Sequence, residues 1–409
     1  MAKRIIMHID MNSYFATVEQ QSNPLLRGKP ICVAGKSLNS ERTVCCAASV
    51  EAKKFGLKSG MGVWEAKNLC PNITIVTADY LKYQFISQKF IRLLENYTPL
   101  IEVFSIDEAF LDLTGQIDSL EEVIPIAMEI KSRLKEEIGD YLTCSVGIST
   151  NKLMAKLASE KVKPDGLTLI REDEIKKILL KTPIEELCGI GRRLEPRLNA
   201  LGIKTAGELG CFSTESLTRL FGPHLGQKLS QMGKGIDSSP VVPYYEMPPE
   251  KSFGHSYTLP KDISQLKEIN KVLLKLAEKV GRRMRQAKAM GRTIYLYVRF
   301  FDRTGKSMRI TISTFTNDGF QIYLLAKNLL KKCFTGKPIR LIAVSMTNIK
   351  PSKNISQAVL PLDQQNDHIL KMLDKINNRY GEFTIFRANL TQIKDRIENI
   401  PDGRNKRFI

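Results

Sequence analysis

The stretch "EVFSIDEAFLDL", residues 102–113, has the apolar residues of a buried strand but carries two adjacent carboxylates, Asp107 and Glu108, in its middle. Neighbouring side chains in a regular strand point to opposite faces of the sheet. The two carboxylates can therefore serve one site only if a turn or a bulge lies between them, and we expect the chain to bend there. The apolar residues of the stretch are Val103, Phe104, Ile106, Phe110, Leu111 and Leu113.

The charge of this pair also needs an explanation. Buried carboxylates without a partner are costly, and no Lys or Arg lies between Arg92 and Lys131 in the sequence. A divalent metal ion would neutralise the pair. An alternative needs no metal, because Asp107 could cap a turn while Glu108 points to solvent.

A third carboxylate belongs to the same hypothesis. "RIIMHIDMN" (4–12) predicts a strand that ends at Asp10, and "KPICVAG" (29–35) predicts another strand. If Asp10 and the 107–108 pair meet at one edge of a sheet, they suit two magnesium ions about 3.5 to 4 Å apart. One ion would activate an attacking hydroxyl and the other would hold a triphosphate.

Size and composition point to a globular, multidomain protein. The chain has 409 residues, of which 43% are apolar, enough for about two to four domains. No signal peptide or membrane span is expected, so a cytoplasmic location without a membrane is predicted. The eight cysteines include one vicinal pair and no C-x-x-C, which favours reduced thiols in the core.

The net charge of +19 favours a polyanionic partner. Between Tyr244 and Asn354 there are 22 Lys and Arg against 7 Asp and Glu, so this segment carries most of the excess. A solvated charged surface is the simpler explanation of a basic stretch, but such a concentration favours nucleic acid.

The pattern of apolar residues predicts an α+β multidomain fold. Strands and helices alternate up to Gly166, which is typical of a sheet with helices on one face. Short helices separated by Gly follow over 170–233, and a Pro- and Ser-rich linker comes next. The segment 251–352 has the order β-α-β-β-α-β of a split βαβ domain. One more helix is predicted, capped by Asp367 and ended by Gly381.

Four segments together resemble the Y-family translesion DNA polymerases in order and spacing. They are "IDMNSYF" (9–15), "SIDEAFLDLTG" (105–115), "CSVGISTNKLMAKLASEKVKPDG" (144–166) and "GIGRRLEPRLNALGIKT" (189–205). The resemblance covers residues 5–362 and implies a right-hand polymerase. Its expected parts are a palm (1–10 and 78–166), fingers (11–77), a helical thumb with a helix-hairpin-helix (167–234), a linker (235–250), a β-α-β-β-α-β little finger (251–352) and a tail (353–409).

The resemblance also implies the active-site residues. Asp10, Asp107 and Glu108 would be the catalytic carboxylates that bind two Mg²⁺ ions, with the backbone carbonyl of Met11 as a further ligand. Phe15 would exclude ribonucleotides by colliding with a 2′-hydroxyl, and Tyr14 would support it. Without the motif around it, Phe15 would be interpreted as a core aromatic at a strand-helix junction.

Three positions differ from the polymerase IV pattern. Val50 and Lys53 stand where that pattern has Tyr and Arg, and Asn12 replaces the second Asp of a D-x-D pair. Lys53 would still bind nucleotide phosphate, but as a point charge, because an ammonium group cannot contact two oxygens as the guanidinium of Arg does. These departures resemble the polymerase V catalytic subunit, so the chain is expected nearer that branch. Lys163, before Pro164, matches a palm lysine that reaches the triphosphate.

Two further motifs imply partners. In the helix-hairpin-helix, Gly189 and Gly191 would let backbone N–H groups meet a DNA phosphate, with Arg192 beside them, although a plain helix-helix turn explains the glycines as well. "QAVLPL" (357–362) resembles a clamp-binding peptide in which Gln357, Leu360 and Leu362 would dock on the sliding clamp.

The expected function is DNA-templated DNA synthesis from dNTPs on primer-template DNA, across damaged bases, in DNA repair and the SOS response. A catalytically impaired accessory protein that binds DNA and the clamp is an alternative, as is another palm enzyme such as a nucleotide cyclase. A polymerase V likeness would add a small regulatory partner and a recombinase filament.

Overall fold

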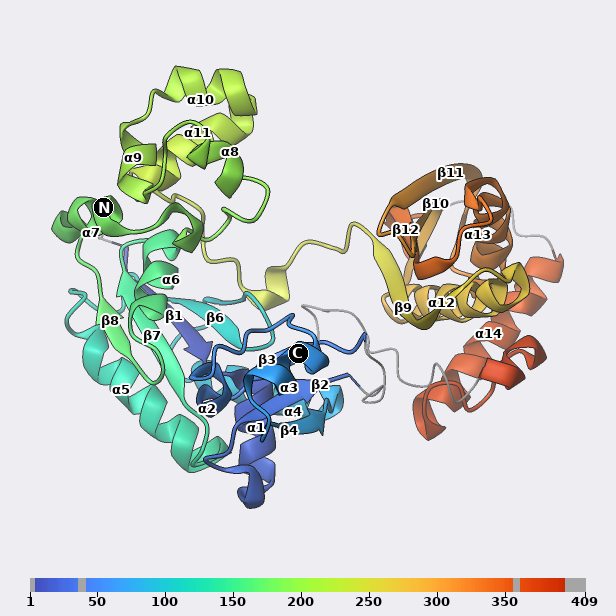
Figure 1. Cartoon of the computed structure of the whole chain (residues 1–409), viewed down its shortest axis with the longest axis horizontal. Coiled ribbons are helices and arrows are strands. Elements are labelled where there is room, and N and C mark those ends of the chain that lie inside the picture. The colour runs from blue at the N-terminus through green and yellow to red at the C-terminus, as the bar shows by residue number, and fades with distance from the viewer. Residues whose placement is uncertain (1–3, 36–41, 356–360, 394–409) are drawn as a thin grey trace. The chain divides into compact units, whose positions relative to one another are not determined.

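The computed structural model describes residues 4–35, 42–355 and 361–393. The chain divides into two compact units, the first ending at Met247 and the second beginning at Pro248 (Figure 1). The boundary lies inside the segment 235–250 that the sequence predicts as a linker. No helix of the described residues is long and apolar enough to span a membrane.

The first unit is built on a five-stranded sheet with the order β5-β6-β1-β7-β8. Its strands are β1 (Ile6–Met11), β5 (Ile101–Val103), β6 (Glu108–Asp112), β7 (Cys144–Ser149) and β8 (Leu167–Leu169), antiparallel except for the parallel pair β7-β8. Because β8 belongs to this sheet, the predicted boundary between palm and thumb at 166–167 separates two paired strands.

Helices cover both faces of this sheet. The face with Met7 and Ile9 packs against α4 (Tyr80–Leu94) and α5 (Val123–Arg133), and α6 (Lys152–Lys161) packs on the face with Phe110. The prediction of helices on one face was wrong, because apolar side chains of β1 and β6 need cover on both sides.

The stretch 102–113 forms two strands rather than one. β5 ends at Val103 and β6 begins at Glu108, and the two pair antiparallel with Val103 opposite Ala109. The N–H groups of Phe104 and Ser105 donate to the carbonyl of Glu108 at 3.1 and 3.2 Å, which closes the turn. The predicted bend at the carboxylate pair is confirmed.

A smaller three-stranded sheet lies between β1 and α4 in the sequence. Its strand order is β3-β2-β4. In the sequence α1 precedes its first strand, and α2 and α3 connect β3 to β4. The elements are α1 (Tyr14–Ser22), β2 (Ile31–Ala34), β3 (Cys45–Ala48), α2 (Val50–Lys53), α3 (Val63–Leu69) and β4 (Thr74–Thr77). Cys32, Cys45 and Cys70 are buried in its core, as expected, whereas Cys211 elsewhere is exposed.

Short helices follow the main sheet, as predicted. They are α7 (Ile175–Lys181), α8 (Glu195–Asn199), α9 (Ala206–Cys211), α10 (Thr214–Phe221) and α11 (Pro223–Gly233). Their core includes Leu153, Met154 and Leu157 of α6, so the helical region shares that helix with the main sheet. The chain after Gly235 is held against the first unit, because Val242 N–H donates to Glu102 Oε2 at 2.9 Å.

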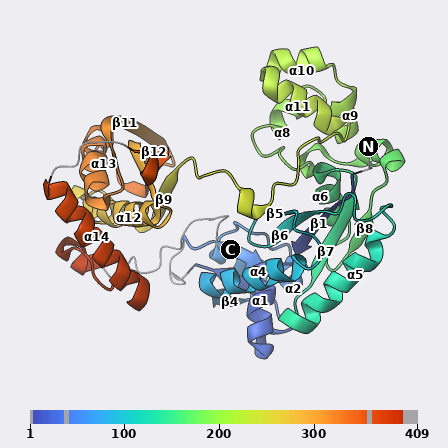
Figure 2. The same ribbon diagram turned by 180° about the vertical axis from the view of Figure 1, so that it is seen from behind.

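The second unit has the predicted order β-α-β-β-α-β. It consists of β9 (Phe253–Ile263), α12 (Leu266–Gln286), β10 (Ala289–Phe300), β11 (Gly305–Thr316), α13 (Gly319–Cys333) and β12 (Ile339–Pro351). The sheet order is β11-β10-β12-β9, and α12 and α13 cover one face (Figure 2).

One more long helix, α14 (Pro361–Tyr380), follows the second sheet. It begins six residues before Asp367, the predicted cap, and Asp367 instead forms an ion pair with Lys371 at 2.7 Å one turn later. Asp374 of α14 pairs with Arg285 of α12 at 2.6 Å, and both views show the two helices side by side (Figures 1 and 2). This part of the predicted tail is therefore docked on the second unit.

Candidate active site

The three residues with the predicted catalytic carboxylates lie at one end of the main sheet. Asp10 lies opposite Glu108 in the antiparallel register of β1 and β6. Side chains of directly opposed residues share one face of a sheet. Asp107 precedes Glu108 in the turn, and its carbonyl accepts the N–H of Met11 at 2.9 Å. The pairing of β1 with β6 thus brings Asp10, Met11, Asp107 and Glu108 together.

Glu108 is held by two basic side chains. Its Oε2 contacts the ammonium group of Lys156 and lies 3.1 Å from His8 Nε2. Burial by itself would raise the pKa of Glu108, but the hydrogen bond from His8 and the charge of Lys156 lower it to about 2. Glu108 is therefore an ionised carboxylate with a fixed position.

The negative charges of Asp10 and Asp107 are less well compensated by neighbouring groups than the charge of Glu108. Burial raises the pKa of both carboxyl groups, although Lys163 pairs with Asp10 at 3.0 Å and Ser105 donates a hydrogen bond to Asp107. Lys156 and Lys163 come from α6 and the turn after it, far from the 102–113 stretch in the sequence. The sequence correctly showed no basic neighbour along the chain and predicted Lys163 as a phosphate ligand, but it missed Lys156, because only the fold brings that lysine to Glu108.

His8 and Ser159 complete the support of Glu108. His8 Nδ1 lies 2.8 Å from Ser159 Oγ, and both side chains are buried. Burial lowers the pKa of His8, and its Nε2 donates to the carboxylate of Glu108, while the hydroxyl of Ser159 donates to the carbonyl of Lys156 at 2.8 Å. A Ser-His-Glu chain could suggest a hydrolase, but a serine that is 1% exposed cannot reach a substrate.

Phe15 and Tyr14 begin α1 directly after β1. The ring of Phe15 stacks on Tyr83 with centroids 4.3 Å apart, and Tyr80 meets it edge to face. Tyr14 is buried, and its hydroxyl donates to the carbonyl of Tyr83 at 2.6 Å. The sequence reasoning missed Tyr83, whose spacing of three residues from Tyr80 on one helix was the available signal.

Lys53 lies at the end of α2, close enough to Asp10 and Asp107 for their charges to act on its pKa. Burial lowers the pKa of Lys53, the charge of Lys163 lowers it further, and Asp10 opposes both effects. Two ammonium groups from separate parts of the first unit therefore lie near Asp10. Val50 begins the same helix and is half-buried.

The predicted helix-hairpin-helix residues lie on the surface of the helical region. Gly189 has a φ of +106°, a left-handed conformation that favours glycine. The carbonyl of Gly191 accepts the N–H groups of Leu194 and Glu195, and Arg192 is exposed. Of the predicted clamp-binding residues, Gln357 and Leu360 lie outside the described residues, and Leu362 lies in the first turn of α14.

The carboxylate end of the main sheet fits magnesium by its chemistry. The donors are carboxylate oxygens and the Met11 carbonyl, the hard oxygen ligands that Mg²⁺ prefers. Burial raises the pKa of Asp10 and Asp107, so added positive charge would stabilise their ionised forms. Within residues 4–35, 42–355 and 361–393, however, no three His, Cys, Asp or Glu side chains converge as a formed metal site.

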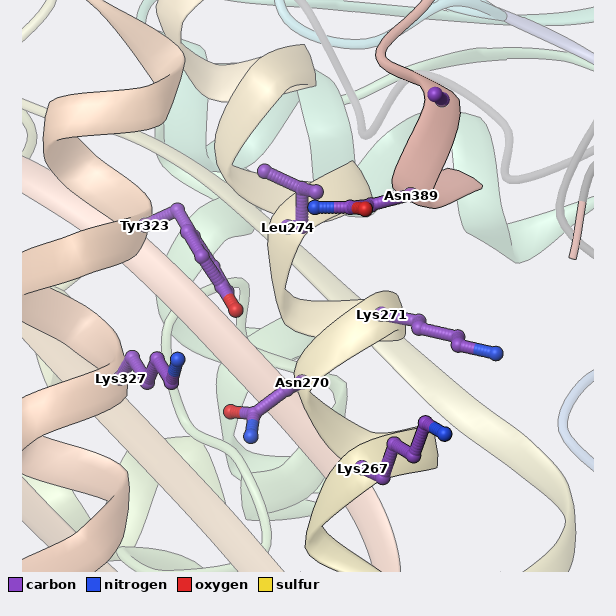
Figure 3. A pocket seen from close by; sticks show the side chains of 8 residues that line it. Lys267, Asn270, Lys271, Leu274, Tyr323, Lys327 and Asn389 are labelled. Atoms are coloured by element: carbon purple, nitrogen blue, oxygen red, sulfur yellow. The ribbon is translucent and has the colours of Figure 1, made fainter. Parts of the chain in front are cut away.

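A hollow of about 540 Å³ in the second unit is a further candidate site (Figure 3). Its polar side chains are basic or neutral: Lys267, Asn270, Lys271, Tyr323, Lys327 and Asn389. Asn270, Tyr323 and Lys327 point toward one another from α12 and α13. Because none of the lining residues is a carboxylate, this hollow does not suit the binding of magnesium.

Comparison with known proteins gives three matching family profiles. The impB/mucB/samB family profile matches residues 9–160, and the profile of its C-terminal domain matches residues 250–359. A profile described as DNA polymerase-iota, thumb domain, matches residues 185–237.

Several relatives are similar over nearly the whole chain. DNA polymerase IV of Moorella thermoacetica is 38% identical over 387 residues, covering 94% of this chain and 95% of the relative. DNA polymerase IV of Pelotomaculum thermopropionicum is 37% identical and covers 94% of each chain. DNA polymerase IV 1 of Bacillus subtilis is 34% identical and covers 99% of this chain and 97% of the relative.

A solved structure is also similar, that of the "Y-family DNA polymerase chimera Dbh-Dpo4(243-245)-Dbh". Its TM-score is 0.75 at 29% identity, and the match covers 84% of this chain and 99% of the other. The three relatives above all carry the name DNA polymerase IV, so they do not support the expected place nearer polymerase V. Three departures, at positions 12, 50 and 53, weigh less than identity spread over the whole chain.

Proposed function

The chain belongs to the Y family of DNA polymerases, and on that premise we propose that it is a polymerase IV-type, DNA-templated DNA polymerase that performs translesion synthesis. The observation that carries the proposal is the register of β1 and β6, which sets Asp10 opposite Glu108 with Asp107 beside them. A polymerase needs such a cluster of carboxylates where a primer 3′-hydroxyl meets a dNTP. The relatives named DNA polymerase IV cover nearly the whole chain.

The carboxylates of Asp10, Asp107 and Glu108, together with the Met11 carbonyl, would hold two magnesium ions. Bound ions of this kind activate the attacking hydroxyl and neutralise the charge that develops on the triphosphate. The protein's own contribution is to keep these ligands in place. His8 and Lys156 hold Glu108 ionised, and the β1-β6 pairing fixes Asp10 against the turn.

The incoming nucleotide would be bound by residues around the carboxylates. Lys53 and Lys163, whose ammonium groups lie near Asp10, would bind the triphosphate as point charges. Phe15, stacked on Tyr83, would meet the sugar and exclude a 2′-hydroxyl, with Tyr14 as its support. Because the ring of Phe15 is packed on another ring, it cannot easily move aside for a larger sugar. Steric exclusion of a 2′-hydroxyl requires that rigidity.

Primer-template DNA would contact two regions. The turn with Gly189, Gly191 and Arg192 would bind a backbone phosphate without reading sequence. In the second unit, the sheet face that α12 and α13 leave uncovered carries Tyr295, Tyr297, Arg299 and Arg309 on β10 and β11. Arg and Tyr side chains on one face suit phosphates and stacked bases.

The four parts of a right-hand polymerase are proposed at the boundaries that the sequence suggests, with β8 (Leu167–Leu169) moved to the palm. The main sheet would be the palm, the small three-stranded sheet the fingers, the short helices the thumb, and the second unit the little finger. The segment 357–362 would bind the sliding clamp. Replacing Gln357 and Leu360 by Ala should remove stimulation by the clamp, and unchanged stimulation would exclude the segment from this role.

The two alternatives make different demands on the molecule. An impaired accessory protein would have lost a catalytic carboxylate, whereas Asp10, Asp107 and Glu108 are all present and adjacent. A nucleotide cyclase would not need the basic sheet of the second unit or the helix-hairpin-helix.

Primer extension tests the proposal directly. The full chain with Mg²⁺, dNTPs and a primed template should add templated nucleotides, and should also extend across a panel of damaged templates. Incubation with ATP alone should give no cyclic product. Absence of templated extension on undamaged DNA would reject the proposed function.

A further inference from the structure

Asn12 follows Asp10 and Met11 at the end of β1 and is only 4% exposed. Its side-chain oxygen Oδ1 accepts hydrogen bonds from Thr143 Oγ1 at 3.0 Å and from the backbone N–H of Asp165 at 2.8 Å. Its Nδ2 donates to Ser145 Oγ at 2.9 Å. One buried amide therefore joins the end of β1 to β7 and to the turn at 163–166.

That turn carries Lys163, the lysine whose Nζ lies 3.0 Å from Asp10 Oδ1. Asp165 has a φ of +57°, an uncommon conformation for a residue with a side chain, so the backbone here needs outside support. Support comes from Asn12 at the Asp165 N–H, and from Lys131 and Lys135, which pair with the Asp165 carboxylate.

We propose that Asn12 is a positioning residue that fixes Lys163 relative to the catalytic carboxylates. It ties the backbone of the lysine's turn to the strand that presents Asp10 and Met11. Asn12 thereby keeps Lys163, which would contact the triphosphate, at a fixed distance from the carboxylates of the proposed metal site. This inference rests on the proposed function, in which Lys163 binds the triphosphate of the dNTP.

The hydrogen bonds also explain why either Asn or Asp can stand at this position. The two donors, Thr143 Oγ1 and the Asp165 N–H, need only an oxygen acceptor, which Asn and Asp share. The third partner is the hydroxyl of Ser145, which can accept from an amide or donate to a carboxylate. Alanine supplies no acceptor and leaves the Asp165 N–H without this partner.

Three variants separate this role from a general effect on stability. Asn12→Ala removes the acceptor, and Asn12→Asp retains it. Asn377→Ala in the second unit is the matched control, because Asn377 is 9% exposed and binds both the N–H and the carbonyl of Ile385. Each variant is measured by amide hydrogen exchange at 163–166 in the DNA-free protein, and by kcat and KM for dNTP in primer extension.

Asn12→Ala should lose exchange protection at Asp165 and raise KM for dNTP about tenfold, with a smaller change in kcat. Asn12→Asp should restore the protection and most of the nucleotide affinity. Asn377→Ala should change neither, even if it melts at a lower temperature.

The inference is overturned if Asn12→Ala keeps the protection at Asp165, or if Asn12→Asp behaves like Asn12→Ala. An unchanged KM in an Asn12→Ala protein that has lost protection would overturn it as well. Hydrogen exchange needs no catalysis, so a wild-type protein that fails to extend primers would reject the proposed function without deciding how Asn12 acts on the turn.

Discussion

The carboxylate end of the main sheet and the uncovered sheet face of the second unit use charge in opposite ways. At the first, three carboxylates are held by named contacts, such as those of His8 and Lys156 with Glu108. On the second, Arg299 and Arg309 belong to a large positive excess spread over a whole unit. Catalysis by fixed charges depends on their exact positions. The attraction of DNA to charges spread over a surface depends instead on how many there are and on the salt concentration. Mutations should therefore have large, specific effects in one region and small, cumulative effects in the other.

The largest expected effect is at the carboxylates. Asp107→Ala or Glu108→Ala should lower primer extension by about 10³-fold or more, because each would remove a proposed magnesium ligand. DNA affinity measured by fluorescence anisotropy should change little. Asp140→Asn, a change at an exposed carboxylate that pairs with Arg27, is the control and should extend primers normally. Full activity of the Ala variants would refute the metal assignment.

A smaller but still specific effect is expected at Phe15, the ring proposed to face the sugar. Phe15→Ala should raise the use of ribonucleotides relative to deoxynucleotides by about 10- to 100-fold, because the ring that would meet a 2′-hydroxyl is gone. The ratio of kcat/KM for dCTP and CTP measures it. Phe15→Tyr keeps the ring and should keep the discrimination; a ratio that Phe15→Ala leaves unchanged would remove Phe15 from this role.

The support of Glu108 should give a moderate effect. Lys156→Met removes a cation from Glu108 and should lower kcat/KM about tenfold, as is usual for groups that orient a metal ligand. Primer extension under saturating Mg²⁺ measures this loss. A variant as active as the wild type would show that His8 suffices.

The ion pair of Glu108 and Lys156 should also change how the stability of the protein depends on pH. The pKa of Glu108 falls from 4.5 to about 2 on folding. A lowered carboxyl pKa adds stability that is present above pH 4.5 and is lost as the pH falls toward 2. Lys156→Met should therefore lower the free energy of unfolding by about 2 kcal/mol at pH 7 and by less at pH 3. Urea denaturation at both pH values tests this, and an equal difference at the two would contradict the ion pair as its cause.

The smallest single effects are expected on the second unit. Arg309→Gln should weaken binding to every DNA sequence alike and reduce the slope of log K against log salt by about one. Lys327→Gln, on the helix-covered side beside the hollow of Figure 3, is the matched change of one charge and should leave the slope unaltered. Equal slopes for the two variants would show that net charge, and not the sheet face, binds DNA.

Much of the fold could be predicted from the sequence. The β-α-β-β-α-β order of the second unit, the strand that ends near Asp10, and the bend at Asp107 and Glu108 all follow from local patterns of apolar and polar residues. The start of α14 was misplaced, because a helix can begin before its best capping residue when tertiary contacts such as Arg285 with Asp374 stabilise it.

By itself, the sequence determined which residues could form the site: three carboxylates, the aromatic at 15 and the lysines at 53 and 163. The carboxylates stand out by residue type and neighbours, whereas the expected roles of Phe15, Lys53 and Lys163 come from the resemblance of their motifs to the polymerase family. Only the tertiary structure decided which groups surround them, such as Lys156 and His8 on Glu108, Tyr83 on Phe15 and Asn12 on the turn of Lys163. These partners lie up to 153 residues apart along the chain, and strand pairing and helix packing, not local propensity, bring them into contact.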